Sequence, residues 1–148
     1  MVPALPLIGG GHTRFQPVFV GDVAAAIAAA LENPDAPGKT YELGGPIIYS
    51  FKELIEIVLR ETGRSRLLVP LPFALASIKA FFLQFAPNPL LTPDQVKLLR
   101  HDNIVAPTAH TLADLGILPT TVEAEVPAYL WRFRAKGEYA GLVSERPR

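Results

Sequence analysis

The chain has 148 residues, with 14 lysines and arginines balanced by 14 aspartates and glutamates, and it has no cysteine. A neutral chain excludes a typical nucleic-acid-binding protein, because phosphate binding needs an excess of positive charge. The absence of cysteine excludes disulfides, thiolate metal sites and a cysteine nucleophile, and it fits a cytoplasmic location. A mean hydropathy of +0.26 excludes a disordered chain. The 15 prolines are about twice the usual share, which indicates many short elements joined by tight connections.

The first predicted elements follow a run of three glycines. Residues 14–20 are rich in aromatic and β-branched side chains, which predicts a strand, and Pro17 places an edge or an irregularity in it because proline cannot donate to a ladder. A helix is expected from Asp22 to about residue 32, with the Asp22 carboxylate as its amino-terminal cap. The many alanines of this helix predict close packing against a sheet or another helix.

Short elements are predicted over the rest of the chain. Strands are expected at residues 40–43, 47–49 and 67–69, and helices at residues 51–62, 72–86, 92–100, 111–115 and 121–135. Ser50 and Thr92 open capping boxes, Gly63 and Gly116 follow helix ends, and Pro127 is expected to bend the last helix. The apolar helix at 72–86 is shorter than the roughly 20 residues of a membrane span, so it predicts at most a helix that faces a membrane surface or a partner.

The motifs of common nucleotide-dependent and hydrolytic enzymes are missing. A G-x-G-x-x-G turn needs a third glycine where the chain has Arg14, and the Walker sequence, the Tyr-x-x-x-Lys pair and the G-x-S-x-G elbow do not occur. The three histidines lack the spacing of metal ligands. His101 beside Asp102 is interpreted as a solvated helix end, because adjacent side chains rarely face one another. The sequence therefore predicts no catalytic residue and no metal site.

Two groups of cationic side chains are candidates for binding. Arg14 lies between the glycine turn and the first predicted strand, where a guanidinium can hold a phosphate or a carboxylate with two hydrogen bonds. A surface ion pair is the alternative for Arg14. Arg132, Arg134 and Lys136 lie on the last predicted helix together with aromatic residues. They form either a solvated helix face or a patch for an anionic lipid surface or a partner.

The order of the motifs carries a resemblance to a known superfamily. Arg14, Val20, Asp22, Val23 and Ala24 match the Arg, apolar strand and V-x-D-V-A helix start of the extended and atypical short-chain dehydrogenases/reductases. The later segments NPDAPGKTYELGGP, YSFKELIEIVLRETGR, LTPDQVKLLRHDNIV and LADLGILPTTVEAEVPAYLWRFR resemble the NAD(P)-dependent epimerase/dehydratase-like branch that includes the accessory NAD(P)H-binding subunit of respiratory complex I. The resemblance runs from about residue 6 to residue 140.

This resemblance implies an α/β fold, or α+β for the chain taken alone. Residues 1–148 would form a single carboxyl-terminal, substrate-side portion, with the last Rossmann-type strand and helix elements and the small substrate-side lobe. The amino-terminal dinucleotide-binding half would be lacking, so NAD(P) is expected in the full-length parent and no cofactor in this chain alone. Arg14, Gln16 and Pro17 are the candidate substrate-binding residues.

Three functions follow from the resemblance and remain open. The first is the substrate-side portion of an atypical NAD(P)-dependent oxidoreductase or epimerase-like protein, inactive alone. The second is a non-enzymatic accessory or assembly subunit of NADH:ubiquinone oxidoreductase or a quinone-related membrane complex. The third is a self-associating module, because loss of the Rossmann half exposes apolar faces. Expected partners are that missing half or a second copy, with a membrane complex or anionic lipid surface as a further possibility. The expected location is cytoplasmic or at the surface of the inner membrane.

Overall fold

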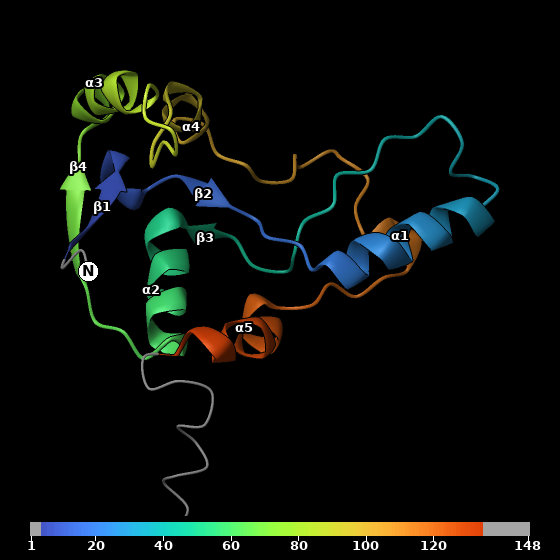
Figure 1. The fold of residues 1–148 in the computed structure, drawn as a ribbon. Coiled ribbons are helices and arrows are strands. Elements are labelled where there is room, and N and C mark those ends of the chain that lie inside the picture. Colours follow the sequence, from blue (N-terminus) through green and yellow to red (C-terminus); the bar gives the residue numbers. More distant parts are fainter. Residues whose placement is uncertain (1–3, 135–148) are drawn as a thin grey trace, which may run out of the picture.

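The computed structural model describes residues 4–134, which form a mixed α/β structure with a parallel strand pair. The predicted α/β class is confirmed at this level. The elements follow one another as β1 (Ala4–Ile8), η1 (Gly9–Gly11), β2 (Arg14–Phe15), α1 (Val20–Glu32), β3 (Tyr49–Ser50), α2 (Phe51–Glu61), β4 (Leu67–Leu71), α3 (Phe73–Leu83), α4 (Pro93–Leu98), η2 (Ala113–Leu115), α5 (Val122–Leu130) and η3 (Trp131–Phe133). Figure 1 shows β1, β4, α3 and α4 at one end and α1 at the other, with α2 and α5 between them.

The end that holds β1 and β4 has a continuous apolar core. The two strands pair in parallel from Ala4 opposite Leu67 to Ile8 opposite Leu71. The core cluster joins this pair to α3 and α4 through four buried side chains, Ile8, Ala76, Ala80 and Val96. Both alanines are 0% exposed, because their small side chains let α3 approach its neighbours closely.

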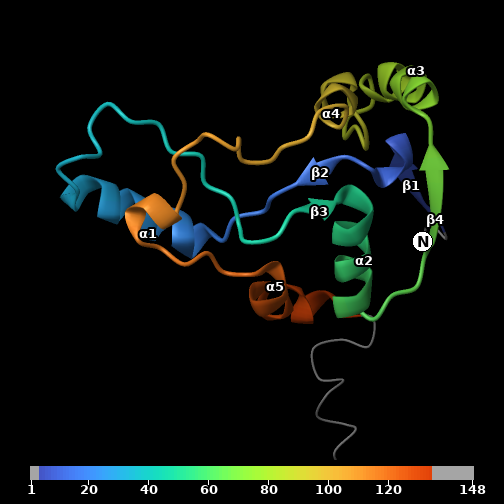
Figure 2. The ribbon, with the colours of Figure 1, turned by 180° about the vertical axis from the view of Figure 1, so that it is seen from behind.

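The middle of the molecule is made of extended segments around β2. This strand pairs antiparallel with β3, and Phe15 forms a parallel bridge with Asn103 on its other side. The strand predicted at residues 14–20 is therefore only two residues long. After it the chain leaves the ladder at Pro17, whose carbonyl oxygen lies so close to Gly45 that a Cβ there would overlap it. Figure 2, seen from behind, shows the same long connections running from this region to α1.

Helix α1 begins two residues earlier than predicted, and Asp22 is not its cap. Phe19 occupies the cap position without a side-chain hydrogen bond, and Asp22 lies inside the first turn. The prediction for Asp22 was wrong because the carboxylate has a distant partner, described below. Only Asp22 and Ala26 are buried on this helix, whereas Val20, Ile27 and Leu31 are exposed on one face.

Both predicted capping boxes and the glycine at the end of α2 are confirmed. Capping boxes close around Ser50 and Glu53 before α2 and around Thr92 and Gln95 before α4. Gly63 follows the end of α2 with a positive φ, as glycine does at helix ends. The last helix is shorter than predicted: α5 contains Pro127 and ends at Leu130, and η3 follows it. Among residues 4–134, none of the helices has the length and apolar character needed to cross a bilayer.

Candidate functional site

Arg14 of β2 makes an ion pair with Asp102. Its backbone N–H donates to Asp102 Oδ1 at 2.8 Å, and its Nε and Nη2 lie 2.9 and 2.8 Å from Oδ2. These hydrogen bonds, the backbone one first, lower the pKa of the Asp102 carboxyl below its usual value. The Arg14 side chain is still 55% exposed. Contact of Arg14 with a substrate anion stays a prediction, and such an anion would meet a guanidinium that already has one carboxylate partner.

Gln16 and Pro17 contact two segments that are distant in the sequence, around Gly45 and around Val105. The Gln16 amide donates to the Gly45 carbonyl at 2.8 Å and accepts from the Val105 N–H at 3.0 Å. Both ends of the amide are thus engaged within the chain, and the Pro17 carbonyl sits against Gly45. The structure gives these two candidate substrate-binding residues a role in cohesion, and their contact with a substrate stays a prediction.

Asp22 joins the start of α1 to the segment before α5. Its carboxylate accepts from the Thr120 N–H at 2.6 Å and from the Thr120 hydroxyl at 2.9 Å. Asp22 is buried, so these two bonds satisfy a charge that would otherwise be costly to remove from water. The two residues are 98 positions apart, and no local pattern in the sequence points from one to the other.

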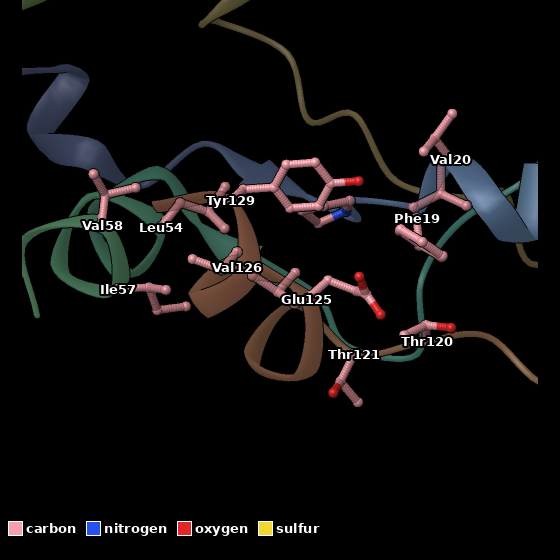
Figure 3. A pocket seen from close by; sticks show the side chains of 13 residues that line it. Phe19, Val20, Leu54, Ile57, Val58, Thr120, Thr121, Glu125, Val126 and Tyr129 are labelled. Carbon is pink, nitrogen blue, oxygen red and sulfur yellow. The ribbon is translucent and has the colours of Figure 1, made fainter. Parts of the chain in front are cut away.

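An apolar groove lies beside this junction, between the segment 17–20, helix α2 and helix α5 (Figure 3). Its volume is about 500 Å³, and its walls include Leu54, Ile57 and Val58 of α2 and Val126 of α5. Tyr49 holds α5 in place, because its hydroxyl donates to Glu123 Oε2 at 2.7 Å. Burial, and then the neighbouring Glu123 carboxylate, raise the pKa of Tyr49 to about 12.

The polar groups of the groove gather at one end. Figure 3 shows the Tyr129 hydroxyl and the Glu125 carboxylate pointing from α5 toward Phe19 and Val20, with Thr120 nearby. Within the described part of the chain, no group of three or more His, Asp or Glu side chains is placed to hold a metal ion. An apolar groove whose polar groups lie at one end has the shape to hold an apolar ligand with a polar tip.

The remaining sequence candidates lie apart from the groove. His101 is exposed in a bend after α4, and the carboxylate of its neighbour Asp102 is paired with Arg14. Arg132 and Arg134 lie in and after η3, and Lys136 lies outside the described residues. Sequence reasoning missed the groove itself: its apolar residues form separate helix faces in the sequence, and only the tertiary fold opposes them.

The fold and the groove define a mixed α/β chain with an apolar groove and, among residues 4–134, no cluster of His, Asp or Glu side chains placed to hold a metal ion. No family model matches the chain. It is 40% identical over 153 aligned positions to NADH dehydrogenase (ubiquinone) 1 alpha subcomplex subunit 9, mitochondrial, of Arabidopsis thaliana, which covers 96% of this chain and 38% of that protein.

Two further relatives agree with this match. The subunit of the same name from Rattus norvegicus is 36% identical over 96% of this chain and 37% of its own length. The NADH-ubiquinone oxidoreductase 40 kDa subunit, mitochondrial, of Neurospora crassa is 31% identical over 88% of this chain and 35% of its own length. The chain is therefore homologous to this complex I accessory subunit over most of its length, which confirms the predicted resemblance at this level. It spans a little over a third of the length of these curated relatives.

Proposed function

We propose that this chain is the carboxyl-terminal, substrate-side portion of an atypical short-chain dehydrogenase/reductase-like accessory subunit of a membrane-bound NADH:quinone oxidoreductase, and that its role is docking or assembly. The observation that carries the proposal is the homology over 96% of the chain to a named subunit of NADH dehydrogenase. It favours the accessory role over the other oxidoreductase or epimerase-like function that the sequence left open.

Apolar surface on two helices supports a docking role. Val20, Ile27 and Leu31 form an exposed stripe on α1, and Leu75, Ile78, Phe82 and Phe85 are exposed on and just after α3. Monomeric proteins rarely leave contiguous apolar faces in water, so such faces mark contacts with other chains. A second copy of this chain, the nucleotide-binding half of the parent and other subunits of the complex are the candidate occupants.

The proposal places NAD(P) in the part of the parent that this chain does not match. The chain lacks the glycine fingerprint, so we expect no nicotinamide cofactor on these residues alone. Titration with NADH, followed through the fluorescence of Trp131, tests this expectation, and micromolar binding would contradict it. Because the relatives carry the word mitochondrial in their names, we place the protein at the inner-membrane surface rather than free in the cytoplasm.

Co-migration on native gels tests the docking role. A tagged copy of the chain, expressed in its source organism, is expected to migrate with the NADH:quinone oxidoreductase. Ile27→Glu places a charge on the exposed stripe of α1 and should release the chain, whereas Ala25→Glu, exposed on the same helix but away from that stripe, should not. Absence of the wild-type chain from the complex would contradict the proposal.

A further inference from the structure

The end of α2 and the last described residues meet at a junction made by two arginines. Arg64 Nη2 donates to the Phe133 carbonyl at 3.2 Å, and Arg134 Nε donates to the Glu61 carbonyl at 3.4 Å. Residues that lie 69 and 73 positions apart in the sequence are thereby brought side by side. Figure 1 shows this junction at the edge of the molecule opposite α3.

The junction concentrates positive charge in an otherwise neutral chain. It carries five arginines, which we call the arginine cluster: Arg60, Arg64, Arg66, Arg132 and Arg134. Two carboxylates face it within the described residues. Glu61 Oε1 lies 3.2 Å from Arg60 Nε. Glu123 accepts the hydrogen bond from Tyr49, and the positive charge of Arg60 helps to lower the pKa of its carboxyl. The cluster therefore keeps a positive excess.

Aromatic side chains alternate with the arginines along the same segment. Trp131 and Phe133 are 39% and 55% exposed, and the guanidinium of Arg132 lies 5.9 Å from the centre of the Phe133 ring. Exposed Trp and Tyr beside cationic residues are typical of the zone where lipid headgroups meet water, because the rings enter the apolar edge while the guanidinium groups reach phosphate.

We propose that the arginine cluster, with Trp131 and Phe133, forms a docking surface for a membrane of anionic phospholipid. A free phosphate ion would be held by the arginines alone and would leave the rings of Trp131 and Phe133 in water. The mixture of guanidinium and aromatic groups instead matches a phosphate-bearing bilayer surface. The proposal rests on the proposed function in one respect: it identifies the face that an accessory subunit of a membrane-bound complex would turn toward the membrane.

Vesicle co-sedimentation of the purified 148-residue chain tests the proposal. We expect binding to phosphatidylcholine vesicles that contain phosphatidylglycerol, little binding to phosphatidylcholine alone, and weakening with salt as surface charges are screened. A blue shift of Trp131 fluorescence should accompany the anionic vesicles and should be absent with inorganic phosphate. Equal binding to neutral vesicles, or no binding to either, would overturn the proposal.

Charge-removal variants locate the surface. Arg60→Gln with Arg132→Gln spares both junction hydrogen bonds, and loss of two surface cations should weaken vesicle binding roughly 30-fold. Lys52→Gln with Lys97→Gln removes the same charge from exposed sites elsewhere and should have little effect. Unchanged binding by the arginine variant, or binding that instead requires Phe82 of α3, would count against the arginine cluster. Vesicle binding uses the isolated chain, so its failure is distinguishable from failure of co-migration with the complex.

Discussion

Two regions of this molecule are held together by different forces. The end formed by β1, β4, α3 and α4 closes around an apolar core in which Ala76, Ala80 and Val96 are almost completely buried. The region from β2 to α1 depends on single polar side chains that reach distant backbone: Arg14 to Asp102, Gln16 to Gly45 and Val105, and Asp22 to Thr120. These bonds fix the path of the chain without burying much apolar surface.

The difference shows which region has an apolar core of its own. Apolar burial is non-directional and stabilises a unit from within, whereas a polar bond fixes geometry and contributes about 1 kcal/mol net. The α1 region therefore has a defined path but leaves Ile27 and Leu31 in water. Exposed apolar side chains are not confined to this region, because Leu75, Ile78, Phe82 and Phe85 are exposed at the other end.

The largest expected effect tests the apolar end. Val96→Ala removes two methyl groups from a side chain that is 1% exposed, and the loss of burial together with the cavity should lower the free energy of unfolding by about 2–3 kcal/mol. Urea denaturation followed by circular dichroism measures it. Val58→Ala, at a half-exposed wall of the groove, serves as the control and should cost much less. Equal losses for the two variants would mean that the core is not the stabilising unit.

The next effect tests the polar region. Asp22→Asn keeps the shape of the side chain but removes the charge and one of the two acceptors that Thr120 uses, so the free energy of unfolding should fall by about 2 kcal/mol. Asp35→Asn, at an exposed turn, is the matched control. In amide hydrogen exchange, Asp22→Asn should loosen α1 while the amides of β1 and β4 stay protected. Uniform loss of protection would show that the two regions unfold as one.

A pH dependence tests the contact between Tyr49 of β3 and Glu123 of α5, close to the groove. The pKa of Tyr49 rises from 10.0 in an unfolded chain to about 12 in the folded one, so the folded state binds the proton more tightly. Its contribution to stability is complete below pH 10 and is lost as the pH rises through 12. Denaturation between these values should show wild-type stability falling more steeply than that of Tyr49→Phe. Parallel curves would mean that neither burial nor the Glu123 contact raises the pKa of Tyr49 in the folded protein.

The sequence predicted what short-range hydrogen bonds determine. Ser50 with Glu53 and Thr92 with Gln95 lie three residues apart, so both capping boxes can be recognised without knowledge of the fold. The strand predicted at residues 67–69 exists and extends to Leu71.

What could not be predicted depends on partners that are distant in the chain. Strand β1 was not predicted. It contains Pro6, a residue that is unfavourable in strands, and only the fold shows that this segment pairs with β4, where Val69 lies opposite Pro6. Asp22 was predicted as a cap because Asp at that position usually is one. Its two carboxylate oxygens instead accept hydrogen bonds from Thr120, which lies 98 residues away. Both errors arose where tertiary contacts replaced the local choice.

The smallest expected effect separates the two interpretations of Arg14. Arg14→Gln removes an ion pair with Asp102 that is largely in water, so it should change the free energy of unfolding less than any substitution above, and less again in high salt.

Asp102→Asn with Arg14 intact leaves the guanidinium without its carboxylate. If Arg14 serves to bind an anion, Asp102→Asn should strengthen binding of inorganic phosphate, measured by NMR shifts of the Arg14 amide and side chain, and Arg14→Gln should abolish it. Lys52→Gln, an exposed cation on α2, is the control. If phosphate shifts Arg14 no more in Asp102→Asn than in wild type, the ion pair alone accounts for this residue, and β2 is held on both sides by polar bonds that serve cohesion only.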